Sequence, residues 1–159
     1  MAPEAHQIEL AMAEKKSLSS EWFRILRDDI CAAFEGVEDL VSTPQKPAGR
    51  FERKSWARDG GGGGEMSIMR GQVFEKVGVN ISTVFGVFPE DFKSQVRGAE
   101  NDGSFWASGI SLVAHMRNPH VPAAHMNTRF ICTSQSWFAG GGDLTPLLPD
   151  AEVGKAFHD

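Results

Sequence analysis

The stretch from residue 108 to residue 146 constrains the fold most, because it combines strand-like segments with a rigid connection between them. It reads SGISLVAHMRNPHVPAAHMNTRFICTSQSWFAGGGDLTP. Residues 105–115 are rich in strand formers, and residues 118–122 contain two prolines, which fix φ and remove backbone donors. The length of this connection suits two neighbouring antiparallel strands. We therefore expect His115, at the end of one strand, to lie close to His125, at the start of the next.

Residues 125–132 predict a strand with two unlike faces, because alternate side chains of a strand share a face. His125, Asn127 and Arg129 point one way, and the opposite set, Met126, Phe130 and Cys132, suits a core. An imidazole, an amide and a guanidinium on one wall are what a carboxylate or another anion needs for binding.

Each feature of this stretch also has a plain structural interpretation. A single histidine near a strand end is more often a surface or hydrogen-bonded residue than a ligand, although His115, His120 and His125 recur at intervals of five. Arg129 could form an ordinary salt bridge. Glycines 140–142 could form a loop before a helix that Asp143 or Thr145 would cap, with Pro146 at the first helical position.

The rest of the chain indicates one front helix followed by strands. Apolar residues recur at helical spacing from Ser20 onward, which predicts a helix. Ser19 or Ser20 can cap its N-terminus, and Gly36 is expected to end it. Residues 1–18 are polar and suit at most a frayed helix. Five glycines at 60–64 either let the backbone approach a ligand closely or let a loop bend. A hairpin is expected to turn near residues 70–71, and the β-branched run 77–88 suits a strand buried on both faces or nearly so. This order predicts an α+β fold with a mainly antiparallel sheet.

Composition excludes several classes of protein. The 159 residues are 41% apolar, which is enough for one core, and the net charge of −5 argues against nucleic acid or an anionic membrane as the main partner. Cys31 and Cys132 show no paired framework and suggest two reduced thiols. The acidic N-terminus disfavours a secretory signal peptide and a transit peptide. The lack of a long apolar run disfavours a membrane-spanning helix. We expect a cytoplasmic protein.

Several motifs together resemble the oxygen-dependent coproporphyrinogen III oxidase family. The central stretch carries GISLV at 109–113, NP at 118–119, HMNTR at 125–129 and DLTP at 143–146. Upstream, WAR at 56–58, GGGG at 61–64, VFEK at 73–76 and GVN at 78–80 follow the same family pattern. The resemblance covers residues 20–159 and implies a large, mainly antiparallel sheet with helices on both faces. The chain departs from the pattern at Met66, Met116, Ser136 and Ala139.

The resemblance implies an oxidoreductase that acts on CH–CH groups with molecular oxygen as acceptor. It would convert two propionates of coproporphyrinogen III to vinyl groups, giving protoporphyrinogen IX, carbon dioxide and hydrogen peroxide in haem biosynthesis, without an organic cofactor. His125 matches the family's proton donor, and Asp143 matches a carboxylate that approaches the pyrrole nitrogens. The substrate-binding positions correspond to Ser111, Asn127 and Arg129.

The resemblance also implies a possible divalent metal and a homodimer. His115, His125 and His158 match three of four histidines described as metal ligands in bacterial members. The family's catalytic domain continues for about as long again beyond the position of Asp159. We therefore expect residues 20–159 to form an incomplete catalytic domain, preceded by an N-terminal tail at residues 1–19. We expect the polypeptide by itself to fold poorly or to be inactive. Two other readings remain open: a non-catalytic remnant that binds a tetrapyrrole, and a small histidine-ligated metalloprotein.

Overall fold

A computed structural model describes residues 3–149 and 151–159 of the chain. One long helix, α1 (Pro3–Asp39), precedes a six-stranded antiparallel sheet in which neighbouring strands follow the order of the sequence. Its strands are β1 (Glu52–Ala57), β2 (Gly62–Met69), β3 (Phe74–Val87), β4 (Ser104–Met116), β5 (Ala123–Cys132) and β6 (Ser136–Thr145). The short helix α2 (Glu90–Lys93) connects β3 to β4, and α3 (Ala151–His158) follows β6. The α+β class and the antiparallel sheet are thereby confirmed.

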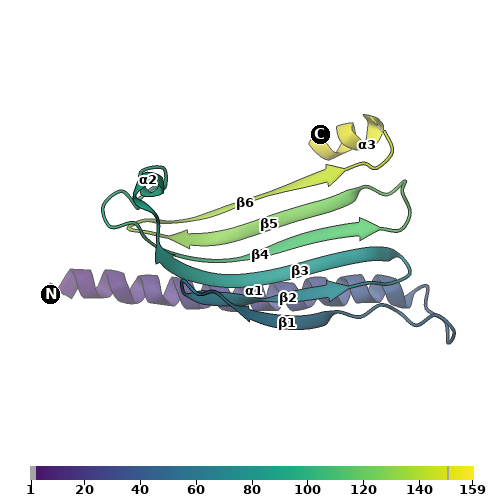
Figure 1. The fold of residues 1–159 in the computed structure, drawn as a ribbon, viewed down its shortest axis with the longest axis horizontal. Coiled ribbons are helices and arrows are strands. Elements are labelled where there is room, and N and C mark those ends of the chain that lie inside the picture. The colour runs from purple at the N-terminus through teal and green to yellow at the C-terminus, as the bar shows by residue number, and fades with distance from the viewer. Residues whose placement is uncertain (1–2, 150) are drawn as a thin grey trace.

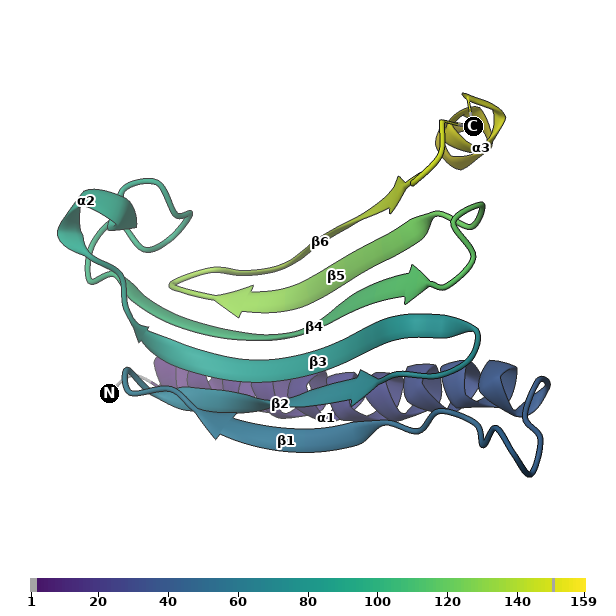
Figure 2. The same cartoon turned by 45° about the vertical axis from the view of Figure 1, so that its right-hand side comes forward.

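Helix α1 covers one face of this sheet and contacts mainly β3 and β4 (Figures 1 and 2). The other helices, α2 and α3, lie at the ends of the sheet in both views. Within the described residues, the face opposite α1 therefore carries no packed helix, and the second helical layer stays a prediction. No helix in the described part of the chain is long and apolar enough to cross a membrane.

The helix is longer than its sequence pattern predicted, and both expected ends were wrong. Ser19 and Ser20 do not cap it, because their hydroxyls donate to the carbonyl of Lys16 at 3.1 and 2.8 Å, as hydroxyls do inside a helix. At the other end the helix continues through Gly36 to Asp39. The expected boundary between residues 19 and 20 falls inside this continuous helix, and Met12, which lies before that boundary, packs against the core.

The core lies between α1 and the sheet face that it covers. Its buried side chains come from α1 and the four inner strands β2 to β5: Phe23, Cys31, Met69, Phe74, Val77, Val79, Ile110, Ala114, Phe130 and Cys132. Both cysteines are free and buried, as the sequence suggested, and burial raises the pKa of each thiol.

Only one face of β3 packs against the helix. Val77 and Val79 face α1 and have no exposed surface, whereas Asn80 and Ser82 on the other face are half-buried. The expectation that this strand is buried on both faces or nearly so was therefore wrong for the described residues, because the second face is only half-buried. The alternation of buried and half-buried side chains is hard to see in this apolar run, because Asn80 and Ser82 are the only polar residues that mark the second face.

The last three glycines of the run begin a strand, and the first two lie in the turn before it. Gly62 begins β2 with a φ of 86°, in the left-handed region that favours glycine. A Cβ on Gly63 would lie 2.3 Å from the carbonyl oxygen of Trp56, and one on Gly64 would lie 2.3 Å from that of Ile81. Glycines 62–64 therefore let β2 approach both neighbouring strands closely, and a close approach of this backbone to a ligand stays a prediction.

Candidate active site

The predicted polar wall lies on the sheet face that α1 leaves uncovered. On β5, His125, Asn127 and Arg129 alternate with residues that face α1, among them Phe130 and Cys132, which are buried. Because cross-strand partners share a face, the same face of β4 carries Ser111, which is the partner of Asn127. We call the face that carries these side chains the open face.

Asp143 joins this wall from the next strand. Cross-strand pairing places it opposite His125, and Oδ2 of Asp143 lies 2.8 Å from Nδ1 of His125. Its other oxygen, Oδ1, accepts from the hydroxyl of Thr145 at 3.5 Å. The carboxylate of Asp143 therefore lies within the wall, beside the imidazole.

The glycine triplet explains how β6 comes so close to β5. The interpretation of residues 140–142 as a loop before a capped helix was wrong, since β6 runs from Ser136 to Thr145 and α3 begins only at Ala151. A Cβ on Gly140 would lie 2.5 Å from the carbonyl oxygen of Asn127. Glycine at this position therefore permits the close pairing that brings Asp143 to His125.

The polar side chains form a continuous series of hydrogen bonds along the open face. Arg129 Nη2 donates to Asn127 Oδ1 at 3.4 Å, and Asn127 Nδ2 lies 3.5 Å from His125 Nε2. The amide nitrogen can only donate, so Nε2 of His125 accepts and its Nδ1 carries the proton that is donated to Asp143. This network orients the imidazole between a carboxylate and an amide, and ends at a guanidinium that is exposed to solvent.

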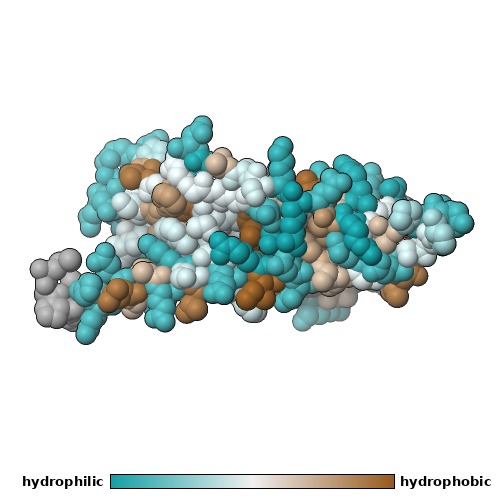
Figure 3. Space-filling model, turned by 90° about the horizontal axis from the view of Figure 1, so that it is seen from below, coloured by the Kyte–Doolittle hydropathy of each residue, from teal (hydrophilic) through white to brown (hydrophobic). Residues whose placement is uncertain are grey.

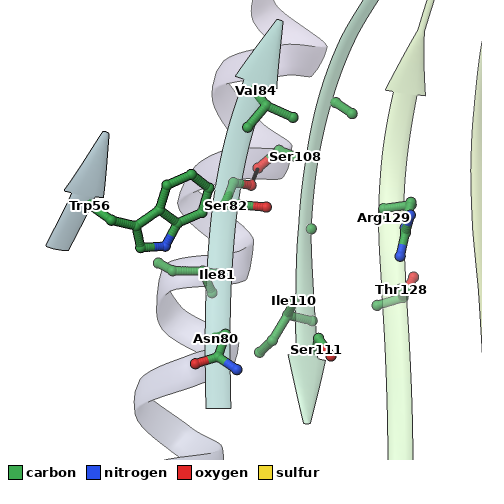
Figure 4. Close-up of a pocket in the computed structure, with 12 residues that line it drawn as sticks. Trp56, Asn80, Ile81, Ser82, Val84, Ser108, Ile110, Ser111, Thr128 and Arg129 are labelled. Atoms are coloured by element: carbon green, nitrogen blue, oxygen red, sulfur yellow. Dashed lines mark hydrogen bonds between the residues drawn. The ribbon is translucent and has the colours of Figure 1, made fainter. Parts of the chain in front are cut away.

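A cavity of about 220 Å³ adjoins this series of side chains. Its polar lining includes Asn80, Ser82, Ser111 and Arg129, with the indole of Trp56 at the β1 side (Figure 4). His125 and Asp143 are not part of this lining and pair with each other further along β5 and β6. Trp56 and Asn80 were not among the predicted site residues, although a lone amide in the apolar run of β3 was a usable signal.

The three histidines predicted to hold a metal do not gather into one group. His115 lies near the end of β4, where Val113 is the partner of His125, and His158 lies in α3. Across the described ranges, no set of three or more His, Cys, Asp or Glu side chains is placed to hold an ion. The three-histidine site therefore stays a prediction.

Comparison with known proteins identifies a single family. A family model described as coproporphyrinogen III oxidase matches residues 19–159. The oxygen-dependent coproporphyrinogen-III oxidase of Rickettsia bellii is 55% identical over 147 residues, which cover 91% of this chain and 52% of that protein. The protein of the same name from Rickettsia akari is 56% identical over the same shares of both chains. The chain thus spans about half the length of the curated relatives that it matches.

Proposed function

Because this chain belongs to the coproporphyrinogen III oxidase family, we propose that its open face binds coproporphyrinogen III and takes part in the oxidative decarboxylation of two propionates. Each propionate, R–CH2–CH2–COO⁻, would lose carbon dioxide, one proton and two electrons to become R–CH=CH2. Molecular oxygen would accept the two electrons and two protons to leave as hydrogen peroxide. One of these protons comes from the side chain of the substrate, so the reaction needs a second proton from the protein or from water.

The hydrogen-bonded series Asp143–His125–Asn127–Arg129 is the observation that carries this proposal. The substrate bears four carboxylates, and a guanidinium beside an amide is suited to hold one of them. In this proposal Arg129 and Asn127 bind a propionate, and Ser111, the cross-strand partner of Asn127, contributes a hydroxyl to the same site. These groups position the ring over the open face.

Asp143 and His125 supply the proton chemistry in this proposal. The carboxylate of Asp143 accepts a hydrogen bond from a pyrrole N–H, which makes the pyrrole more electron-rich and more reactive toward oxygen. In this proposal His125, which bonds to the same carboxylate, takes a proton from water at Nε2 and passes it to the reduced oxygen as the second proton. No organic cofactor or metal ion is assigned a step.

The proposal is tested with protein made from the intact gene, so that any residues beyond position 159 are included. The protein is incubated anaerobically with coproporphyrinogen III, air is admitted, and tetrapyrrole products and hydrogen peroxide are measured. We expect Asp143→Asn to lower kcat by roughly 100-fold or more, since a positioned acid or base contributes about 10²–10⁴-fold. Arg129→Ala should chiefly raise KM, because it removes a binding contact.

Arg24→Ala is the matched control, because Arg24 is exposed on α1, behind the opposite face of the sheet. It should leave both kinetic constants unchanged. Full activity of an Asp143→Ala variant would contradict the catalytic assignment.

Binding without turnover is the second candidate, because the chain covers only 52% of its relatives. The same assay separates the two: a remnant would bind the tetrapyrrole and release no hydrogen peroxide after air is admitted. Metal analysis of the purified protein and of a His115→Ala variant tests the metalloprotein alternative, which requires metal in the first and less in the second. Homodimerisation and a cytoplasmic location stay predictions, the first open to sedimentation analysis and the second to cell fractionation.

A further inference from the structure

We propose that Lys76 is a further substrate-binding residue, whose ammonium binds a second propionate of the tetrapyrrole. In the function proposed above, on which this inference rests, Arg129 holds the first propionate. Lys76 holds the second on the far side of the His125–Asp143 pair. The inference concerns how the carboxylates of the substrate are shared between cations, and it leaves the proton chemistry of the site unchanged.

Strand register places Lys76 on the open face, beyond the transverse row that contains the imidazole and the carboxylate. This row consists of Gly78, Val113, His125 and Asp143, one from each of β3 to β6. Lys76 lies two residues before Gly78 and therefore shares its face. Arg129 lies on the other side of the row, four residues after His125 on β5. The two cations therefore flank the His125–Asp143 pair along the strand direction.

The spacing of the sheet allows both cations to reach one ring. Arg129 is level with Ser82, so Lys76 and Arg129 are separated by two strands, roughly 10 Å, and by six residues along the strands, roughly 20 Å. Their Cα atoms are thus about 22 Å apart, and side chains that each reach roughly 6 Å inward bring the charges to about 10 Å. At about 1.5 Å per covalent bond, extended propionates on opposite sides of a tetrapyrrole place their carboxylates on the order of 15 Å apart. This separation lies between the two limits.

The surface between the two cations leaves room for a ring. Val113, which is apolar, is 37% exposed on the open face. Beside it, the place for a Cβ on Gly78 has no atom nearer than 3.6 Å, and on β6 the place for a Cβ on Gly141 has none within 4 Å. A tetrapyrrole can therefore rest on Val113 with one pyrrole beside Asp143.

The charges of the open face favour a second cation. The substrate bears four carboxylates and Asp143 adds a further negative charge, so Arg129 alone balances little of the total. Lys76 is exposed, and within the residues that the structure describes its ammonium forms no ion pair and no hydrogen bond. It can therefore bind a carboxylate of the ligand without first breaking an ion pair within the protein.

The experiment compares Lys76→Gln and Lys76→Arg with the parent protein, made from the intact gene. Coproporphyrinogen III is dialysed to equilibrium with each protein under nitrogen, and the bound ligand is measured after its oxidation to the coloured porphyrin. Lys76→Gln should raise Kd about fivefold at low salt, since an exposed ion pair contributes up to about this factor. The rise should be smaller at high salt, because ions screen the pair. Lys76→Arg keeps the charge and should bind like the parent.

Lys54→Gln is the matched control. Lys54 is also an exposed lysine on the open face, but it lies on β1, four strands from β5 and therefore roughly 19 Å away across the sheet. It should leave Kd unchanged. An unchanged Kd in Lys76→Gln would overturn the proposal, as would a rise that is the same at low and high salt. An equal rise in Lys54→Gln would also overturn it, because the effect would then be one of overall charge.

Arg129→Ala, measured in the same way, separates this inference from the proposed function. If Arg129→Ala weakens binding and Lys76→Gln does not, the role of Lys76 fails while the site stands. If the parent protein itself does not bind coproporphyrinogen III, both proposals fail.

Discussion

Glu38 joins the end of α1 to the turn between β2 and β3. Its side chain has no exposed surface, and its carboxylate accepts hydrogen bonds from the backbone N–H groups of Gln72, Val73 and Phe74 at 2.7, 2.9 and 3.0 Å, and from Gly49 at 3.4 Å. Burial disfavours the charged form, but the backbone donors outweigh it and hold the pKa of Glu38 below its usual value of 4.5. The ionised carboxylate therefore stabilises the folded state.

Replacing this carboxylate should be costly. Glu38→Gln keeps the shape but turns amide hydrogens toward backbone donors, so we expect the free energy of unfolding to fall by about 3 kcal/mol. Urea denaturation at neutral pH measures this loss. Glu21→Gln, at an exposed position of the same helix, is the control and should change the stability by less than about 0.5 kcal/mol.

The contribution of Glu38 should also depend on pH. Because its folded pKa is lowered, the stabilisation is complete above the unfolded value of 4.5 and is lost as the pH falls through the folded pKa. The difference in stability between the parent protein and Glu38→Gln should therefore shrink on acidification below pH 4.5. A difference that stays constant down to the acid transition would contradict this account.

At the scale of elements, two glycines have opposite roles at the junction of α1 with the hairpin. Gly36 lies within α1 with no atom within 4 Å of the place where a Cβ would be. Gly71 lies in the turn between β2 and β3, where a Cβ would lie 2.2 Å from the carboxyl carbon of Glu38. Glu38 cannot move aside without losing its backbone donors, so this turn requires glycine.

Alanine at these two positions should shift stability in opposite directions. Gly36→Ala should raise the free energy of unfolding by about 0.5–1 kcal/mol, because alanine favours an exposed helix interior. Gly71→Ala should lower it by about 1–3 kcal/mol, because the added methyl overpacks a rigid site. Thermal and urea denaturation of both variants check the pair. Equal changes of the same sign would show that the contact between Gly71 and Glu38 does not control this junction.

At the scale of the whole molecule, apolar surface remains exposed along α1 and the β6 edge of the sheet. A groove of about 460 Å³ between them is lined by Lys15, Leu18, Ser19, Trp22, Phe130, Ser136, Trp137 and Phe138. Leu18, Trp22 and Phe138 in this groove are 59%, 54% and 63% exposed. Seen from the β1 side, in contrast, the surface is mainly hydrophilic with scattered hydrophobic residues (Figure 3).

A polypeptide of residues 1–159 should therefore associate with itself. β6 is an outer strand of the sheet in the described residues, and an unpaired strand beside an apolar groove favours association. Sedimentation velocity should show a mass that rises with concentration, and Phe138→Lys should shift the equilibrium toward monomer. Val87→Lys is the control, since Val87 is 67% exposed on β3 and outside the groove. A parent polypeptide that stays monomeric at every concentration would refute this expectation.

The sequence by itself determined which side chains share a face and which family the chain resembles. The alternation of β5 separates His125, Asn127 and Arg129 from Phe130 and Cys132, because a strand repeats every two residues whatever lies beside it. The hairpin turn near residues 70–71 was predicted for an equally local reason. The motifs identified the family because their spacing can be read without any knowledge of contacts.

Only the tertiary structure decided the contacts between distant segments. Asp143 lies beside His125 because of the register between β5 and β6, which close approach at Gly140 permits. The four donors to Glu38 come from residues 11 to 36 positions away. The extent of α1 and the unpaired oxygen of Asn80 likewise depend on what packs against each segment. Local sequence patterns specify faces, whereas strand register and packing specify partners.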